Sequence, residues 1–336
     1  MQTSRRSFIR TTTLSGVGLS LFSTAVFGNT SPQAVRLAYL TDSCVSLANS
    51  EGGSFAATLH LDSLNDAAFR HLLQRDDIDA LVVDVAPARR VSIAVAAMKA
   101  GRITAFTGPV GQTTGQLQLL AQTFERTQTP CLLLDEDQIN AKVQAISELV
   151  EGGKFGEITS VQCGTESPTN GLGPTLGWLG INQTNRFTSL NASVSQSWGL
   201  HEASSVETGR QNGVIEKHYE LGEVLTINLQ CSSGQAVTVY KDLKGNRPYN
   251  RDYHVQGTRG LWVEDNELLT LDNKSVALPT PEVGQDALSA LKRALSNKTI
   301  TPTDTRHALA ISLVYAVAKA SLGAWGEEVE MPNWFV

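Results

Sequence analysis

The end of the second expected strand carries an acidic residue where a nucleotide-binding domain uses one. Asp62 follows the run "AATLHL" at 56–61. A carboxylate at this position can accept hydrogen bonds from the hydroxyls of a ribose. The same residue precedes an apolar helical pattern that starts at Leu64, so a helix N-cap is at least as good an interpretation. Asp62 is therefore a cofactor-binding candidate with a structural alternative.

The turn after the first expected strand has no glycine fingerprint for a dinucleotide. The strand "VRLAYL" at 35–40 is followed by "TDSCVSLANSEGG", without a Gly-x-Gly-x-x-Gly pattern. Glycines are needed there so that the backbone can approach a pyrophosphate at a helix N-terminus. The second strand also begins only about fifteen residues later, which leaves little room for a crossover helix. Binding of a dinucleotide at this turn is not supported by its residue types.

Cysteine and histidine show no metal-binding pattern. Cys44, Cys131, Cys163 and Cys231 form no Cys-x-x-Cys pair, and three of them lie in or beside apolar runs. Packed small side chains are the favoured interpretation, while disulfide pairing stays open. The histidines that could do chemistry in the second half, His201, His218 and His254, are isolated and fit structural roles better than catalytic ones.

The first half of the chain alternates between short strand-like runs and helical spacing. Runs such as "VRLAYL", "DALVVDV", "ITAF", "PCLLL" and "ITSVQC" read as buried strands, and the segments between them repeat apolar residues every three or four positions. This α/β alternation predicts a Rossmann-like domain at 31–165, with a parallel sheet covered by helices on both faces.

The second half has a different rhythm. Alternating runs such as "VLTINLQCSSGQAVTVYKDL" predict antiparallel strands, with a hairpin turn at "SSGQ". A helix is expected to begin at Pro174, and two more near 287–295 and from Pro302 to about Leu322. We expect an α+β domain at 166–336, built on an open antiparallel sheet with a C-terminal helix and tail.

Several blocks of this sequence resemble the glucose–fructose oxidoreductase/inositol dehydrogenase (Gfo/Idh/MocA) family. They are "DIDALVVDVAPARRVSIAVAAMKAGR" (77–102), Thr-Gly-Pro (107–109) and "ELVEGGKFGEITSVQCG" (148–164). Within that family, "PTNGLGPTLGWLGINQTNRF" (168–187), "NRPYNRDYHVQGTRGLW" (246–262) and the tail "EMPNWFV" look like glycoside hydrolase family 109. The resemblance implies two domains, an NAD(P) cofactor across the first, and a glycosidase branch that oxidises and re-reduces its sugar.

The resemblance also implies site residues. Asp135 lies where these glycosidases place a glutamate, and Tyr249 matches the tyrosine of the Arg-Pro-Tyr block between Arg247 and Arg251. Arg89 and Arg90 replace a Trp-His pair of the family. Each has a simpler alternative: a helix cap for Asp135, a packed ring for Tyr249, and paired or solvated surface charge for the arginines.

The residues that would perform the family's chemistry are replaced. Gly108 stands where the family has a lysine that binds the reacting hydroxyl, and only the turn-forming Pro109, possibly cis, is kept. By this resemblance Gly108 and Pro109 are cofactor-binding candidates beside Asp62. Asn170 stands where the histidine of a Pro-Thr-His block is expected, and Ser167 replaces a tyrosine before it. An amide can hydrogen-bond a sugar, so Asn170 stays a substrate-binding candidate, but it cannot carry a proton at neutral pH.

The N-terminus and the charge balance bear on localisation and partners. "SRRSFIR" at 4–10 followed by a short apolar run has the pattern of a twin-arginine export signal, so we expect residues 1–30 to be removed and the protein to be periplasmic or extracytoplasmic. The net charge of -6 without basic clusters argues against nucleic acid, and no membrane binding is expected after signal removal. A carbohydrate or other small molecule is the expected ligand, and the open sheet favours a homo-oligomer.

Three hypotheses follow from the sequence. The first is an active nicotinamide-dependent sugar oxidoreductase or glycosidase with replaced catalytic residues. The second, slightly favoured, is a divergent member with lost or altered catalysis that binds a sugar or a protein partner. The third is an oligomeric component of a larger carbohydrate-processing system.

Overall fold

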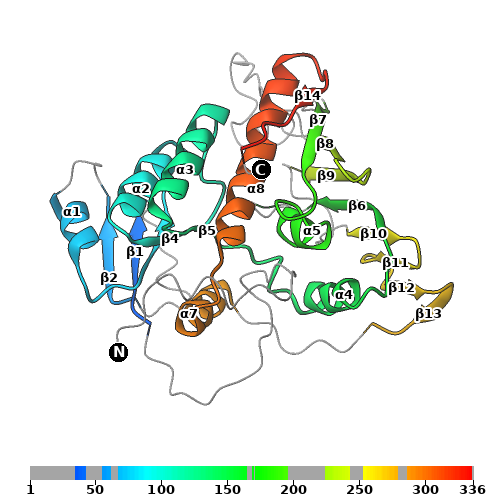
Figure 1. The fold of residues 1–336 in the computed structure, drawn as a ribbon, viewed down its shortest axis with the longest axis horizontal. Coiled ribbons are helices and arrows are strands. Elements are labelled where there is room, and N and C mark those ends of the chain that lie inside the picture. The colour runs from blue at the N-terminus through cyan, green and yellow to red at the C-terminus, as the bar shows by residue number, and fades with distance from the viewer. Residues whose placement is uncertain are drawn as a thin grey trace, which may run out of the picture.

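The computed structural model describes residues 35–42, 55–61, 67–164, 169, 171–195, 224–242, 253–278 and 286–334. These residues form two sheets that lie on either side of a long helix, α8 (Pro302–Gly323) (Figure 1). The first sheet is parallel and has five strands, and the second has nine strands that are mostly antiparallel. The expected Rossmann-like α/β fold with a second α+β part is confirmed.

The parallel sheet has the strand order β2-β1-β3-β4-β5. Its strands are short and apolar, and β1 and β3 are buried along almost their whole length, as expected for strands covered on both faces. The strands are β1 (Leu37–Thr41), β2 (Ala57–His60), β3 (Ala80–Asp84), β4 (Ile103–Phe106) and β5 (Cys131–Leu133).

Helices cover both faces of this sheet, and the helix on one face comes from the C-terminal part of the chain. Side chains of α1 (Ala67–Gln74), α2 (Pro87–Lys99) and α3 (Thr114–Thr127) pack in one cluster with Leu81 and Phe106. On the opposite face, Leu288 and Leu291 of α7 (Ala287–Asn297) pack against Leu37, Tyr39 and Val82. The helix expected near 287–295 is confirmed, and its apolar residues complete the core of the first sheet.

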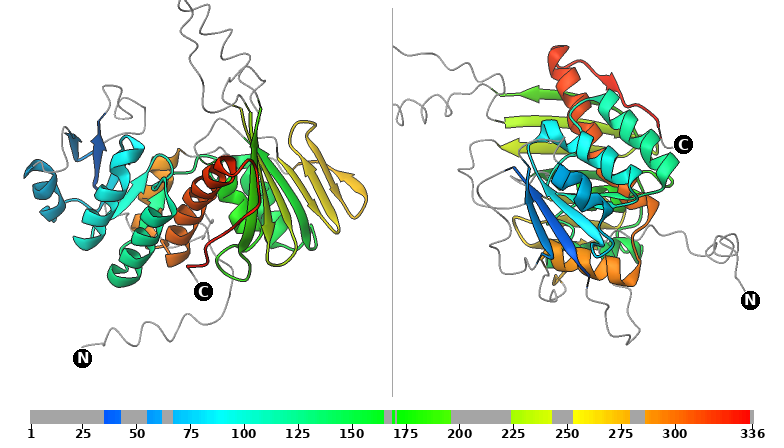
Figure 2. Two further views of the ribbon diagram at one scale, coloured as in Figure 1. Left: turned by 90° about the horizontal axis from the view of Figure 1, so that it is seen from above. Right: turned by 90° about the vertical axis from the view of Figure 1, so that its left-hand side faces the viewer.

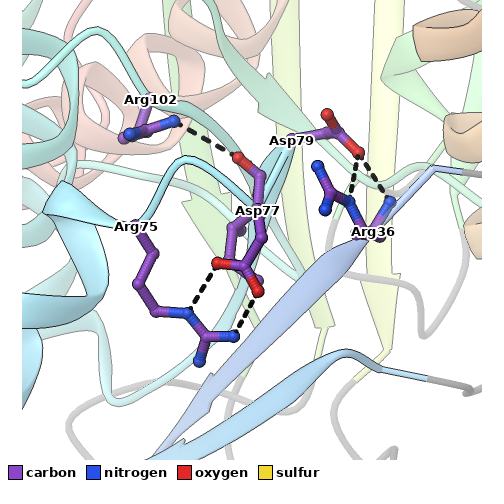
Figure 3. Close-up of polar contacts among 6 residues, drawn as sticks. Arg36, Arg75, Asp77, Asp79 and Arg102 are labelled. Atoms are coloured by element: carbon purple, nitrogen blue, oxygen red, sulfur yellow. Dashed lines mark hydrogen bonds and ion pairs between the residues drawn. The ribbon is translucent and has the colours of Figure 1, made fainter.

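The loop between α1 and β3 is held by ion pairs (Figure 3). Arg75 donates two hydrogen bonds to Asp77, and Arg36 pairs with Asp79. Arg102, before β4, reaches Asp76 in the same loop. These pairs are largely exposed, so they order the loop more than they stabilise the fold.

The second sheet has the order β13-β12-β11-β10-β6-β9-β8-β7-β14. Neighbours pair antiparallel except β6 and β9, which are parallel. The predicted "SSGQ" hairpin is confirmed, because residues 232–235 join β8 to β9. The strands are β6 (Ile158–Gly164), β7 (Phe187–Val194), β8 (Val224–Cys231), β9 (Ala236–Asp242), β10 (His254–Gly257), β11 (Gly260–Val263), β12 (Leu268–Leu271), β13 (Lys274–Val276) and β14 (Val329–Glu330).

The strand predicted at 158–163 lies in a different sheet from the one expected. The sequence pattern predicts it as the last strand of the parallel domain, but β6 pairs with β9 and β10 in the nine-stranded sheet. Its burial alternates along much of its length, as in a sheet with one packed face, whereas β1 is buried continuously. The domain limits 31–165 and 166–336 remain a prediction.

Three helices connect the two sheets. α4 (Ala141–Glu151) and α5 (Leu172–Trp178) contact each other, and α5 lies on β6. α8 lies between the sheets and contacts α3, β5 and β7 (Figure 2). The helix predicted from Pro302 is confirmed as α8. The helix predicted to begin at Pro174 begins two residues earlier, at Leu172. Pro174 then lies in the first turn, where a proline is tolerated because no intrahelical N–H donor is needed.

Among the described residues, no helix is both long enough and apolar enough to cross a membrane.

Candidate ligand-binding site

The carboxyl ends of the parallel strands bring polar side chains together, but these side chains bond one another. Asp84, at the end of β3, accepts a hydrogen bond from the Tyr39 hydroxyl at 2.8 Å and another from Thr107 Oγ1 at 2.9 Å. Gly108, the next residue, is buried and carries no side chain into this edge. This edge therefore presents the Asp84 carboxylate and the hydroxyls of Tyr39 and Thr107. Position 108, where the family resemblance implies a lysine, supplies no amine.

The turn at Pro109 is anchored from two sides. Arg90 of α2 donates from Nη1 to the Pro109 carbonyl at 2.9 Å and from Nε to the Val85 carbonyl at 2.9 Å. The Val110 N–H donates to Ser312 Oγ of α8 at 2.9 Å. The peptide bond before Pro109 is trans, so the possible cis turn is not formed. Burial lowers the pKa of Arg90, with the charges of Asp84 and Asp42 opposing the shift.

The N-terminus of α2 is occupied by a carboxylate of the chain itself. Asp42, just after β1, accepts from the Ala86 N–H at 3.0 Å. Arg89 lies 3.6 Å from the same carboxylate and donates to the Leu61 carbonyl at 2.6 Å. A helix N-terminus is where an anion binds most readily, and here Asp42 takes that position.

Two buried carboxyl groups follow β5. Asp135 and Asp137 are each only 1 % exposed. Thr169 Oγ1 lies 2.9 Å from Asp135 Oδ1 and 3.1 Å from Asp137 Oδ2, and the Gly171 N–H donates to Asp137 Oδ2 at 3.0 Å. Thr169 and Gly171, just before α5, are therefore hydrogen-bonded to the two carboxyl groups that follow strand β5.

Asp135 has the properties of a functional acid. Its Oδ2 has no hydrogen-bond partner within the described part of the chain. Burial, and next the charge of Asp137, raise the pKa of Asp135 to about 7. A cavity of about 10 Å³, large enough for about one water molecule, lies beside it and beside His307. Asp135 Oδ1 also accepts from the Asp137 N–H at 3.0 Å, which caps the turn at 136–139, while Asn140 caps α4 by accepting from the Lys142 and Val143 N–H groups.

The glycines of the "NGLGP" block allow this close packing. A Cβ on Gly173 would lie 1.6 Å from Asp135 Oδ2, and one on Gly171 would lie 2.9 Å from the Tyr253 hydroxyl. Gly171 also has φ 76°, a left-handed conformation that favours glycine. Tyr253 donates to the Gly171 carbonyl at 3.1 Å, and burial raises its pKa well above its usual value.

The structure brings some predicted site residues to one edge and leaves others outside its described part. Arg90 and Pro109 are in contact, and Asp135 lies two residues after the end of strand β5. Sequence reasoning missed Asp137, Thr169, Gly173 and Tyr253, which surround Asp135 from segments far apart in the chain. The candidates outside the described residues, which stay predictions, are Asp62, Asn170, Arg247, Tyr249 and Arg251.

Comparison with solved structures defines the class of fold. An inositol dehydrogenase homolog from Azotobacter vinelandii, complexed with NADH and myo-inositol, superimposes with a TM-score of 0.65 at 12% identity, covering 94% of this chain and 100% of that one. A levoglucosan dehydrogenase complexed with NADH and levoglucosan gives a TM-score of 0.64 at 13% identity, covering 89% and 90%. The fold is that of the Gfo/Idh/MocA dehydrogenases.

Sequence comparison then gives the branch. Residues 157–283 match the glycosyl hydrolase 109 C-terminal domain. An alpha-N-acetylgalactosaminidase of Tannerella forsythia is 25% identical over 342 residues, covering 79% of this chain and 73% of the relative. A glycosyl hydrolase family 109 protein of Stenotrophomonas maltophilia is 26% identical over 254 residues, covering 62% and 56%. The chain is related to the Gfo/Idh/MocA oxidoreductases and, within them, to glycoside hydrolase family 109.

The described residues do not include the phosphate site of the dinucleotide that this relationship implies. In a Rossmann-like domain the pyrophosphate is bound at the turn after the first strand, and here that turn, residues 43–54, lies outside the described part of the chain. Its sequence has no Gly-x-Gly-x-x-Gly pattern. At the described edge of the sheet the Ala86 N–H donates to Asp42, Arg89 lies beside the same carboxylate, and Arg90 donates to two backbone carbonyls.

Proposed function

We propose that this protein is an exported, carbohydrate-binding relative of glycoside hydrolase family 109 in which the nicotinamide-dependent reaction has been lost. The observation that carries the proposal is the edge around Gly108. Asp84 is hydrogen-bonded to Thr107 and Tyr39, and Arg90 holds the Pro109 turn, so the polar groups at this edge bond the chain itself.

Loss of the proton-handling groups supports the same proposal. General acid–base catalysis contributes about 10²–10⁴ in rate. A glycine at position 108 and an amide at position 170 supply neither a base nor an acid at neutral pH. The segment from Thr169 through α5, by contrast, is packed tightly on Asp135 and Asp137, which preserves the shape of the second domain.

Carbohydrate is proposed as the ligand because of the relatives. The Tannerella forsythia relative is described as an alpha-N-acetylgalactosaminidase, and two structural neighbours hold myo-inositol or levoglucosan. All of these ligands are uncharged polyols or sugars. Export through the twin-arginine route, proposed from "SRRSFIR", would place the protein where such glycans are met, and cell fractionation with Arg5→Lys/Arg6→Lys as the comparison tests that part.

The function is tested by two titrations of the purified mature protein. We expect NAD and NADP at millimolar concentration to leave the thermal midpoint unchanged, and N-acetylgalactosamine or its methyl glycoside to bind with a measurable heat. A rise in the midpoint of several degrees with NAD would contradict the loss of the cofactor. Absence of binding to any sugar of a glycan array would contradict the carbohydrate part.

One observation favours a second candidate, an enzyme with replaced catalytic residues. Asp135 is buried, its Oδ2 lacks a hydrogen-bond partner among the described residues, and its pKa is raised to about 7, which suits a general acid or base at neutral pH. This candidate predicts hydrolysis of an aryl N-acetylgalactosaminide. Activity that disappears in Asp135→Asn, with the fold retained, would support it over the proposed function.

A further inference from the structure

A cleft beside α4 and α5 is a feature that the proposed function has not used. It has a volume of about 410 Å³, within the usual range for small-molecule sites. Its walls come from α4, α5 and the turn between β8 and β9. None of the residues that line it belongs to the group of Asp42, Asp84, Gly108 and Arg90.

The polar wall of the cleft is held in place by buried hydrogen bonds. Asn185 is only 7 % exposed, and its Nδ2 donates to the Leu179 carbonyl and to Gln235 Oε1, both at 3.0 Å. Its Oδ1 accepts from Ser232 Oγ at 3.0 Å and from the Arg186 N–H at 2.9 Å. The turn that forms this wall is therefore fixed before any ligand arrives, which lowers the entropic cost of binding.

The opposite wall is equally rigid. Trp178 of α5 donates from Nε1 to Ser147 Oγ of α4 at 2.8 Å. Its ring packs edge-on against Tyr253, with centroids 5.3 Å apart, and against Trp262 at 6.3 Å. The cleft thus lies between an aromatic cluster and an amide-rich turn.

The charge of the lining selects the kind of ligand. The described residues that line the cleft include Glu151 and Glu157, and none of them is a lysine, arginine or histidine. Partial burial and the neighbouring Glu148 raise the pKa of Glu151. A further negative charge on a ligand beside Glu151 would be repelled in the same way. The described lining therefore offers an anion no positively charged side chain. It suits hydroxyl groups, because carboxylates accept hydrogen bonds from them and amides and hydroxyls both donate and accept.

We propose that this cleft between α4, α5 and the β8–β9 turn is the binding site for an uncharged saccharide unit. The half-buried Val150 supplies apolar surface for the C–H face of a sugar ring, and Gln183, Gln235 and Glu157 supply hydrogen bonds for its hydroxyls. The inference rests on the proposed carbohydrate-binding function and places the ligand outside the group of Asp42, Asp84, Gly108 and Arg90, in a cleft whose lining residues Gln138 and Gly173 also lie beside Asp135.

A glycine in the cleft provides the test. Gly177 lines the cleft, lies on α5 and is exposed, and a Cβ added to it meets no atom within 4 Å. A side chain can therefore start at position 177 without a Cβ clash, and Gly177→Gln adds bulk to the lining of the cleft. Gly115 on α3 is also exposed, has equally open space and lies outside the cleft, so Gly115→Gln is the matched control.

Calorimetric titration of the mature protein with methyl N-acetylgalactosaminide and with galacturonate decides the outcome, with circular dichroism to check the fold. We expect the neutral sugar to bind the native protein and Gly115→Gln equally, Gly177→Gln at least tenfold more weakly, and galacturonate at least tenfold more weakly than the neutral sugar. Unchanged binding by Gly177→Gln, or loss of binding only in Asp135→Asn, would overturn the cleft and leave the proposed function standing. Failure of the native protein to bind any sugar would overturn both.

Discussion

At the scale of single residues, Asp135 is the most informative side chain of the site. Its burial beside Asp137 could not be predicted from the sequence, because Thr169 and Gly173 pack on Asp135, and the Gly171 N–H donates to Asp137, from a segment more than thirty positions away. The sequence predicted the residue as a candidate from family resemblance. Its environment, which raises its pKa to about 7, comes from tertiary packing.

The raised pKa of Asp135 makes folding stability depend on pH in a defined direction. A carboxyl group with a pKa of about 7 in the folded state keeps its proton while the unfolded chain has lost its own near pH 4. The folded state binds more protons, so stability falls as pH rises between about pH 4 and pH 7. We expect Asp135→Asn to remove this slope and to raise the free energy of unfolding at pH 8 by roughly 2–4 kcal/mol.

Urea unfolding at pH 5 and pH 8 measures this effect. Asp77→Asn is a suitable control, because the exposed Arg75 beside Asp77 lowers the pKa of that carboxyl to about 2, outside the range tested. An Asp135→Asn variant with the same pH slope as the native protein would show that Asp135 is ionised in the folded state at pH 5. His307 acts in the opposite direction: burial lowers its pKa to about 4, so its contribution is lost as pH falls from about 6.5 to 4.

At the scale of elements, periodicity predicted most helices and strands but not how the sheets share them. The apolar runs of β1, β3 and β5 and the hairpin β8–β9 could be predicted, because local patterns encode them. The placement of β6 in the second sheet and of α7 under the first could not. Both depend on pairing between segments far apart in the chain, which a local pattern does not contain.

The long helix α8 is the element that fixes the site. Ser312 Oγ accepts the Val110 N–H just after the Pro109 turn, and Thr305 Oγ1 accepts the Cys131 N–H at the start of β5. We expect Ser312→Ala to destabilise the protein by about 1–3 kcal/mol, because the Val110 N–H is then buried without a partner. The exposed Ser92→Ala on α2 should change stability by less than about 0.5 kcal/mol, as measured by urea unfolding. Equal stability of both variants would contradict the anchoring role.

At the scale of the whole molecule, the open face of the nine-stranded sheet is the proposed site of self-association. One row across it runs through Asn191, Asn228, Thr238, Gln162 and His254 in register. Asn228 donates to Asn191 Oδ1 at 3.0 Å and accepts from Thr238 at 3.1 Å, so this row is polar and ordered.

Light scattering after size exclusion tests this association. We expect the mass of the native protein to be a multiple of the monomer and Asn228→Arg to lower it, because a charge in the middle of the row cannot be paired across a symmetric contact. Lys319→Glu on the exposed surface of α8 should leave the mass unchanged. A native protein that elutes as a monomer at all concentrations would contradict the proposal.

The central claim, that this fold has kept its shape and lost its nicotinamide chemistry, is tested most directly on the purified protein after acid release. The supernatant is analysed by absorbance at 260 nm and by mass spectrometry for NAD and NADP. Because the turn after β1 has no Gly-x-Gly-x-x-Gly pattern and Gly108 stands where the family has a lysine, we expect no nicotinamide nucleotide above trace amounts. One nucleotide released per chain would contradict the account.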